Sequence, residues 1–338
     1  MTALLEARGV SKTFNAGGFF SKKQLVALDN ASLVIDADRP SITAIAGESG
    51  SGKTTLARLI LGIIQPSAGQ MLYKGKELDK MDGAERRSFR REVQAIFQDP
   101  FEVYNPFYKV DHTLVLSVEK FGLAKSRAEA RDLIENALRT VGLRPEETLG
   151  RYPHQLSGGQ RQRVMVARAF LLKPRVIVAD EPVSMVDASL RATILESLLK
   201  LNQELGVSLV YITHDLTTAY QLSGSILMLY QGSVVEVGDV ERVIKDPQHP
   251  YTRLLVGSIP LPNPKLRRSG DKLRVTLDEV SANLSEGCRF ADRCPYVTAI
   301  CRESSPRLYL TEPRRATACY LFKDSPTATS EEVSRASA

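Results

Sequence analysis

The sequence predicts an α/β protein whose core is a mostly parallel sheet, followed by a small cysteine-bearing module. Over the first ~240 residues, short apolar runs alternate with amphipathic stretches, which is typical of a chain in which strands and helices alternate. A glycine-rich turn that begins at Gly47 joins one apolar run to a helical stretch. All four cysteines lie in the C-terminal part of the chain, where prolines interrupt regular structure.

The chain of 338 residues is long enough for about two domains. Its 43% apolar and 25% charged residues exclude a wholly disordered or fibrous protein. The net charge of +6 permits a nucleic acid or an anionic membrane as partner but does not demand one. No apolar run approaches the ~20 residues of a membrane span, and Glu6 and Arg8 stand where a signal peptide would be apolar. We therefore expect a cytosolic protein that reaches a membrane only through a partner.

The first elements of the core follow one another in a regular order. Residues 42–46 predict a buried strand, and residues 53–64 predict a helix that ends at Gln-Pro-Ser-Ala-Gly. Two further strands are predicted at residues 70–74 and 93–97. The chain then changes character, and residues 99–160 are expected to form a helical subdomain, in which Ser-Arg-Ala-Glu is a capping box.

The second half of the core continues this alternation. Strands are predicted at residues 176–179 and 208–213, and the helix between them has its leucines on one face. Residues 226–237 predict a hairpin that turns at Gln-Gly. The last residues, 325–338, are small and polar, so we expect them to be disordered.

The sequence Gly-Glu-Ser-Gly-Ser-Gly-Lys-Thr fits the pattern G-x-x-x-x-G-K-[ST] between a strand and a helix. Glycines let the backbone turn its N–H groups toward phosphate oxygens, beside the positive end of the helix dipole. The lysine reaches the β- and γ-phosphates, and the threonine hydroxyl binds Mg²⁺. We therefore predict a P-loop NTPase rather than a chance glycine-rich turn. Its nucleotide-binding residues are Gly47, Glu48, Ser49, Gly50, Ser51, Gly52, Lys53, Thr54 and Thr55.

Two carboxylates, Asp180 and Glu181, follow the apolar strand Val-Ile-Val-Ala. In a P-loop protein Asp180 can hold Mg²⁺, usually through water. Glu181 then stands where it could orient or deprotonate the attacking water. The alternative is a strand that ends in two solvated acids, and the P-loop makes this alternative the weaker one.

A second phosphate-binding helix start is predicted at the sequence Leu-Ser-Gly-Gly-Gln. Its residues are Leu156, Ser157, Gly158, Gly159 and Gln160. One nucleotide needs only one P-loop, so this second helix start would contact the nucleotide of another molecule. With this motif the chain closely resembles the ABC ATPase family, whose signature it is. The resemblance spans residues 4–240 and implies a nucleotide-binding domain over residues 1–245, with a RecA-like core, an antiparallel β subdomain and a helical subdomain.

The resemblance also gives roles to residues outside these motifs. It implies that Gln98 is the Q-loop glutamine, which touches Mg²⁺, and that Asp187 lies at the dimer seam. His214 would be the switch histidine, which contacts the γ-phosphate. Phe14 would stack on adenine, and two phenylalanines in the segment 15–24 compete for this role.

The C-terminal part resembles that of oligopeptide, dipeptide and nickel importer ATPases, because residues 246–252 contain their His-Pro-Tyr segment. In this subfamily the spacing of the four cysteines resembles that of a [4Fe–4S] site; they are Cys288, Cys294, Cys301 and Cys319. Zinc also accepts four thiolates, but structural zinc sites usually pair cysteines two to four residues apart. An unmetallated module is the third alternative. We expect a C-terminal domain over residues 246–324 that lies apart from the ATP site, so that changing a cysteine leaves nucleotide binding intact.

The resemblance implies one ATPase subunit of an importer. Two such subunits would close head to tail around ATP, and a second, non-identical ATPase subunit is the expected partner. Two membrane permeases would dock near the Q-loop and the helical subdomain, a separate protein would bind the substrate, and the ATPase would sit at the cytoplasmic face of the inner membrane. Peptides are the expected cargo, with nickel and oligosaccharides as alternatives.

A soluble ABC ATPase acting on nucleic acid is the rival class. It would account for the net positive charge and for metal-bound cysteines. Such proteins generally have two cassettes, a long coiled coil or large inserted domains, whereas this chain has one cassette and no sustained heptads. We therefore expect no nucleic acid among the partners.

Overall fold

The structure is a computed structural model that describes residues 3–15, 24–98, 104–184, 186, 188–259 and 286–337. The chain folds into two compact units. The first unit is formed by residues 1–38, 42–79 and 212–338, and the second by residues 39–41 and 80–211. The C-terminal part of the chain therefore lies in the same compact unit as the first strands.

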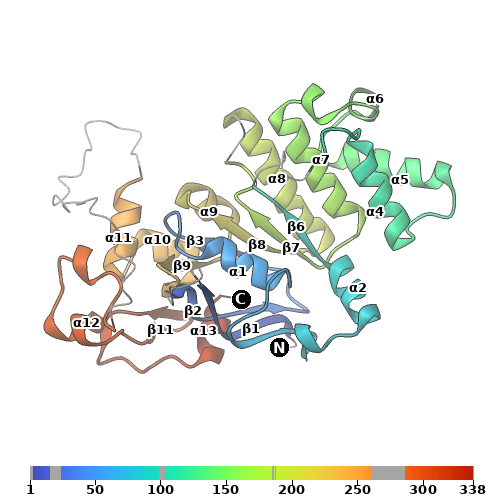
Figure 1. Ribbon diagram of the computed structural model, residues 1–338. Coiled ribbons are helices and arrows are strands. Elements are labelled where there is room, and N and C mark those ends of the chain that lie inside the picture. The colour runs from blue at the N-terminus through green and yellow to red at the C-terminus, as the bar shows by residue number, and fades with distance from the viewer. Residues whose placement is uncertain are drawn as a thin grey trace, which may run out of the picture. The chain divides into compact units, whose positions relative to one another are not determined.

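The first unit consists of a mixed sheet with short helices around it (Figure 1). Its strands are β1 (Ala3–Asn15), β2 (Gln24–Asp36), β3 (Ile42–Ala46), β4 (Ala68–Tyr73), β5 (Lys76–Glu77), β9 (Ser225–Tyr230), β10 (Ser233–Asp239), β11 (Tyr309–Glu312) and β12 (Arg315–Thr317). Its helices are α1 (Lys53–Ile60), α9 (Leu216–Leu222), α10 (Val240–Lys245), α11 (Pro250–Gly257), α12 (Ala299–Glu303) and α13 (Ser330–Ala336).

The strands of the first unit lie in the order β5-β4-β1-β2-β10-β9-β3, and β11 and β12 join the sheet at β10. The pairs β1/β2, β1/β4 and β9/β10 are antiparallel, whereas β2/β10 and β3/β9 are parallel. All residues of β3 and β9 are buried, as expected of strands covered on both faces. The predicted hairpin is confirmed: Gln231 and Gly232 have φ of 45° and 84°, as a type I′ turn requires.

The second unit is largely helical (Figure 1). Its elements are α2 (Gly83–Glu92), β6 (Val93–Ile96), α4 (Asp111–Phe121), α5 (Arg127–Thr140), α6 (Pro145–Thr148), α7 (Gly158–Leu171), β7 (Val176–Asp180), α8 (Ala188–Leu205) and β8 (Ser208–Thr213), of which β8 ends in the first unit. Strands β6 and β7 pair in parallel, and α4 and α5 pack on α7. The predicted capping box begins α5, where the Oγ atom of Ser126 accepts a hydrogen bond from the N–H of Glu129 at 3.1 Å.

Two local predictions need correction. The helix predicted for residues 53–64 ends at Ile60, because the next residues leave the helical ladder through Gly62, whose φ is positive. Pro250 does not break regular structure but begins α11, since a proline at the first position of a helix gives up only an N–H that the helix does not use.

The prediction of a disordered tail is wrong for residues 325–337. A capping box at Thr329 begins α13, and Val333 and Ala336 are buried on the sheet. The carbonyl oxygen of Ser337 accepts hydrogen bonds from the hydroxyls of Thr43 and Ser225, each at 2.7 Å. The composition of the tail suggested disorder because its few apolar residues are small, but they are enough to cover one strip of the sheet. Among the described residues, no helix is long and apolar enough to cross a membrane.

Candidate nucleotide and cysteine sites

The loop between β3 and α1 has the backbone of a phosphate-binding loop. Gly47 and Gly52 have φ of 152° and 102°, and no other residue type would fit at either position. A Cβ atom on Gly47 would lie 2.1 Å from the carbonyl oxygen of Leu229, and one on Gly52 would lie 2.4 Å from that of Ala27. No side chain caps α1, so its first N–H groups remain available to an anion.

Lys53 lies inside this loop and is only 6% exposed. Its Nζ atom donates hydrogen bonds to the carbonyl oxygens of Gly47 and Glu48 at 2.7 and 2.8 Å. The buried hydroxyl of Ser51 has no hydrogen-bond partner among the described residues, and that of Thr54 is on an exposed side chain. A loop with buried positive charge, uncapped helical N–H groups and an unpaired hydroxyl suits the phosphates of ATP.

Two more predicted residues lie in the first unit. Phe14 is near the end of β1, 39% exposed, and the Nζ atom of Lys12 lies 5.3 Å from its ring centre. An exposed ring beside a cation can stack on a base. His214 directly follows β8 and is exposed, and the next residue, Asp215, caps α9. The two competing phenylalanines and Asp187 lie outside the described residues.

The second unit brings Gln98 and Glu181 together. The Nε2 atom of Gln98 donates a hydrogen bond to Oε2 of Glu181 at 3.1 Å. Asp180 is the buried last residue of β7, and Glu181 then turns out of the strand with a φ of 44°. The backbone and the hydroxyl of Ser184 both donate to the carbonyl oxygen of Glu181, which fixes this turn.

The segment Leu156 to Gln160 forms the start of α7 as predicted. Ser157 is the N-cap residue, and its Oγ atom accepts a hydrogen bond from the N–H of Gln160 at 3.2 Å. The side chain of Gln160 accepts in return from the N–H of Ser157 at 2.9 Å. Leu156 is buried, whereas Ser157 is exposed. The serine oxygen is thus used as an acceptor while its hydrogen can point outward to an anion.

The four cysteines line one cavity of about 130 Å³ in the first unit. The N–H of Cys288 donates to the carbonyl oxygen of Cys301 at 2.7 Å, and the hydroxyl of Thr298 lies 3.3 Å from the Sγ atom of Cys301. None of the four cysteines forms a disulfide with another described residue. Among the described residues, no group of three or more histidines, cysteines or acids has an arrangement that could hold a metal ion.

The surroundings of the thiols combine apolar walls with backbone donors. Burial raises the pKa of Cys288, Cys294 and Cys319, that of Cys319 to about 11. Hydrogen bonds from nearby backbone N–H groups oppose this rise in pKa, and they come from Phe290 and Ala291 at Cys288 and from Leu321 at Cys319. Backbone N–H donors directed at sulfur suit a bound thiolate. Among the described residues, however, the four sulfur atoms are not arranged around a common metal position.

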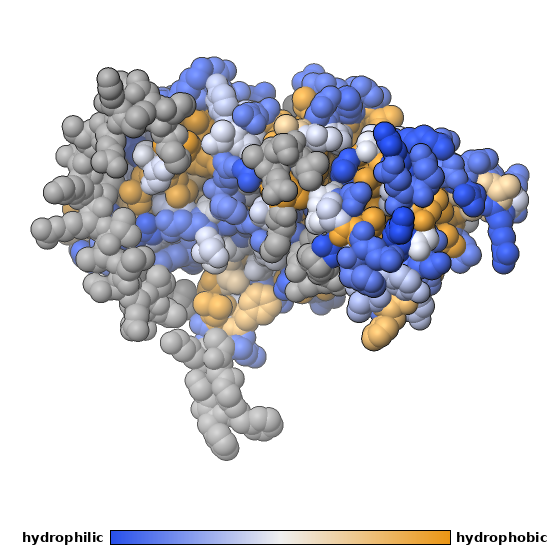
Figure 2. All heavy atoms as spheres, turned by 90° about the horizontal axis from the view of Figure 1, so that it is seen from above, coloured by the Kyte–Doolittle hydropathy of each residue, from blue (hydrophilic) through white to orange (hydrophobic). Residues whose placement is uncertain are grey.

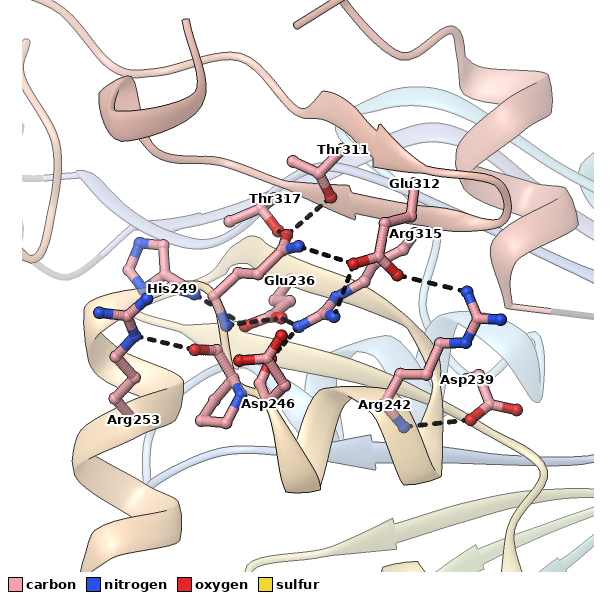
Figure 3. Close-up of polar contacts among 12 residues, drawn as sticks. Glu236, Asp239, Arg242, Asp246, His249, Arg253, Thr311, Glu312, Arg315 and Thr317 are labelled. Carbon is pink, nitrogen blue, oxygen red and sulfur yellow. Dashed lines mark hydrogen bonds and ion pairs between the residues drawn. The ribbon is translucent and has the colours of Figure 1, made fainter.

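A buried network holds the His-Pro-Tyr segment onto the sheet (Figure 3). Glu236 on β10 and Arg315 on β12 are both buried and form an ion pair at 2.8 Å. The same carboxylate accepts hydrogen bonds from the backbone N–H groups of Gln248 and His249 at 3.1 and 3.0 Å. Arg315 also donates to the carbonyl oxygen of Asp246. No sequence pattern predicts this network, because its members lie up to 79 residues apart.

His249 remains neutral in the folded protein. It is 1% exposed, and burial lowers its pKa to about 3. A hydrogen bond with the backbone of Ala318 raises the pKa, but by less than burial lowers it. Its Nδ1 atom accepts from the N–H of Tyr251 at 3.0 Å. An unfolded chain protonates histidine near pH 6.5, so between pH 6.5 and about 3 the unfolded state binds the additional proton.

We expect this histidine to make the free energy of unfolding fall as the pH drops below 6.5, by about 1.4 kcal/mol per pH unit. Urea unfolding of wild type and His249→Asn between pH 7 and pH 5 measures the effect. The variant should lose less stability on acidification than wild type, whereas His154→Asn, which changes an exposed histidine, should behave as wild type. Equal acid sensitivity in wild type and His249→Asn would contradict the assignment.

The structure corrects one expectation about the cysteine module. Its Arg293 and the tyrosine of the His-Pro-Tyr segment, Tyr251, both contact Glu48 of the phosphate-binding loop. The module therefore does not lie apart from the ATP site. No sequence pattern predicts these contacts, because neither residue belongs to a motif of the nucleotide site.

Comparison with known proteins places the chain in a family. The ABC transporter family matches residues 28–184, and the family described as the C-terminal region of oligopeptide/dipeptide transporters matches residues 235–301. A putative peptide import ATP-binding protein of Brucella ovis is 38% identical over 318 residues, which cover 94% of this chain and 98% of that protein. The dipeptide transport ATP-binding protein DppF of Haemophilus influenzae is also 38% identical, over 94% of this chain and 97% of its own length.

Solved structures of ATP-binding cassettes have a similar fold. The ATP-binding cassette MJ0796, in a dimeric post-hydrolysis state bound to ADP and Pi, has a TM-score of 0.62 and 29% identity over 70% of this chain and 98% of its own. CbiO1 from Clostridium perfringens has a TM-score of 0.61 and 26% identity over 73% of this chain and 92% of its own.

The fold and the phosphate-binding loop thus define an ABC ATPase cassette, which confirms the predicted fold class. The chain belongs to the family of ATP-binding subunits of oligopeptide and dipeptide ABC importers.

Proposed function

We propose that the protein binds and hydrolyses ATP to drive the uptake of di- or oligopeptides through partner permeases. The observation that carries this proposal is the presence of both family regions in one chain, with relatives aligned over nearly their whole length. These relatives are named for peptide import or dipeptide transport. Peptides are therefore preferred to nickel or oligosaccharides as cargo.

In the first unit, the P-loop residues are proposed to hold ATP. Lys53 would bind the β- and γ-phosphates, and the hydroxyl of Thr54 would bind the Mg²⁺ ion. The exposed ring of Phe14 would stack on adenine, and His214 would contact the γ-phosphate. The support is the loop geometry, the burial of Lys53 and the exposure of the other three side chains.

In the second unit, Gln98 and Asp180 are proposed to bind Mg²⁺, and Glu181 to orient and deprotonate the attacking water. The hydrogen bond between Gln98 and Glu181 supports a shared role at the reacting phosphate. Leu156 to Gln160 and Asp187 would contact the nucleotide of the opposing subunit. The support for this trans contact is Ser157, an exposed N-cap residue whose hydroxyl hydrogen can face an anion.

The partners are proposed to be a second ATPase subunit, two permeases and, through them, a substrate-binding protein. Exposed apolar and aromatic side chains of the second unit suit permease docking; they belong to Phe107, Tyr108, Val115, Leu116 and Tyr152. The N–H of Val110 donates to the carbonyl oxygen of Arg151 at 2.9 Å, which joins the segments that carry Tyr108 and Tyr152. Figure 2 shows apolar side chains at the surface among hydrophilic ones over the helices of this unit. Such docking would place the protein at the cytoplasmic face of the inner membrane.

Uptake assays in a strain that lacks this chain test the function. Wild type should restore uptake of radiolabelled di- and tripeptides, and Lys53→Ala should not, because it removes the phosphate-binding ammonium group. Lys200→Ala changes an exposed lysine of α8 and should restore uptake as wild type does. Restored uptake of nickel or oligosaccharides without peptides would overturn the peptide assignment.

The four cysteines are proposed to hold a [4Fe–4S] cluster, with Zn²⁺ as the alternative. The protein purified without oxygen should then contain about four irons per chain and absorb broadly near 400 nm. Serine in place of Cys288, Cys294, Cys301 or Cys319 should remove both signals, since each supplies one thiolate. Thr298→Val removes only a hydroxyl beside Cys301 and should keep them. Stoichiometric zinc without iron would contradict the cluster.

A further inference from the structure

Residues from two distant segments hold Glu48, the second residue of the phosphate-binding loop. The guanidinium of Arg293 donates two hydrogen bonds to its carboxylate, from Nη1 to Oε2 and from Nη2 to Oε1, both at 2.9 Å. The backbone N–H of Glu48 donates to the hydroxyl of Tyr251 at 2.8 Å. The side chain and the peptide group of one loop residue are thus fixed from outside the loop.

Glu48 in turn positions the lysine that binds phosphate. Its carbonyl oxygen accepts a hydrogen bond from the Nζ atom of Lys53, as does that of Gly47. The N–H of Glu48, which donates to Tyr251, belongs to the same peptide group as the carbonyl oxygen of Gly47. The carbonyl of Glu48 itself is the second acceptor for Lys53. A shift of Glu48 would move both carbonyl oxygens that hold the ammonium group.

Arg293 is itself held more firmly than a surface arginine. Its guanidinium lies 5.7 and 5.6 Å from the ring centres of Tyr230 and Phe290, and its side chain is only 27% exposed. The two hydrogen bonds to Glu48 raise its pKa, so it stays charged. Tyr251 is fully buried, 4.6 Å from the ring of Tyr230. Bidentate, ring-packed ion pairs are stronger than isolated surface pairs.

Arg293 belongs to the segment that carries the cysteines. It ends the short helix Ala291–Arg293 and directly precedes Cys294. A second arginine of this segment, Arg289, donates to the carbonyl oxygen of Gln231 and to Oδ2 of Asp29. The neighbouring Gly232 donates from its N–H to the carbonyl oxygen of Ser51 at 2.8 Å. The cysteine segment thus contacts the phosphate-binding loop directly through Arg293, and indirectly through Arg289 and the turn at Gln231 and Gly232.

We propose that Arg293 and Tyr251 are positioning residues for ATP: they fix Glu48 and, through it, Lys53, so that the cysteine segment sets how the phosphate-binding loop holds nucleotide. The inference rests on the ATP binding of the proposed function and adds a route by which the state of the cysteine segment regulates it. Because coupling between two sites is reciprocal, ATP binding must also stabilise the cysteine segment.

Equilibrium titration of the full-length protein with a fluorescent ATP analogue tests the positioning. Arg293→Met should raise the Kd about tenfold, because it removes two charge-assisted hydrogen bonds from the loop. Arg293→Lys keeps the charge and should restore part of the affinity. Arg302→Met is the matched control, since Arg302 pairs with Asp292 on the surface of the same segment and should leave the Kd unchanged.

A double-mutant cycle separates this path from a direct contact of Arg293 with nucleotide. Glu48→Gln combined with Arg293→Met should weaken ATP binding no more than Arg293→Met alone, because both changes break the same pair. Fully additive losses would overturn the proposal, as would an unchanged Kd in a normally folded Arg293→Met. Tyr251→Phe, which removes only a hydroxyl, supplies an independent variant and should also raise the Kd.

Amide hydrogen exchange supplies a readout that a purely structural role would not change. ATP should slow exchange in residues 287–294 of the wild type and have no effect there in Arg293→Met. Failure of the wild type to bind ATP would count against the proposed function itself. ATP binding without protection of residues 287–294 would overturn only the positioning role.

Discussion

Glu181→Gln is expected to lower the rate of ATP hydrolysis about 10²–10⁴-fold while ATP still binds. The amide keeps the size of the side chain but cannot take a proton from water. Gln98, which donates to this carboxylate at 3.1 Å, can still donate to the amide oxygen, so the turn after β7 should keep its shape. Phosphate release in assemblies in which every P-loop belongs to this chain measures the rate, and equilibrium titration measures ATP affinity.

Glu196→Gln is the matched control for this experiment. Glu196 lies on α8 of the same unit and pairs with Lys200 at 2.9 Å on the surface, so its loss should leave hydrolysis unchanged. If Glu181→Gln hydrolyses ATP at the wild-type rate, another group activates the water. If it fails to bind ATP, Glu181 supports the site rather than the proton transfer.

The loop and helix starts of the proposed nucleotide site could be predicted, because each depends on a short, contiguous segment of sequence. Glycines at 47 and 52 are needed where the backbone has positive φ against neighbouring carbonyl oxygens, and a lysine and a threonine must follow at fixed spacing. The signature segment carries its own capping box, so Ser157 and Gln160 are readable as a helix start. Motifs of this kind can be identified from neighbouring residues alone, without knowledge of the fold.

The C-terminal part could not be predicted in the same way, because long-range contacts determine it. Strand β12 has only three residues, and its place in the sheet depends on pairing with β10 far earlier in the chain. Helix α13 looked too polar to fold, yet the hydroxyls of Thr43 and Ser225 hold the carbonyl that follows its end. The composition of a segment does not predict contacts with residues so distant in the sequence.

The buried pair Glu236–Arg315 illustrates how strongly such contacts matter. Glu236→Gln is expected to lower the free energy of unfolding by about 3–5 kcal/mol, because it leaves the charge of a buried arginine without its main partner. The amide oxygen can accept fewer of the three hydrogen bonds that now reach the carboxylate. Part of the loss is offset, since Glu312 also contacts Arg315 at 3.4 Å.

Urea unfolding followed by far-ultraviolet circular dichroism measures this loss, because the chain has no tryptophan to report on it. The double change Glu236→Gln with Arg315→Met removes both charges and should be more stable than Glu236→Gln alone, since no buried charge is then left unpaired. Lys245→Met breaks an exposed pair with Glu241 and should leave the unfolding midpoint unchanged.

Because Glu236 also holds the backbone of His249, two residues before Tyr251, Glu236→Gln should weaken ATP binding as well. An unfolding midpoint equal to that of wild type would show that Glu312 and the carbonyl of Asp246 satisfy Arg315 without Glu236.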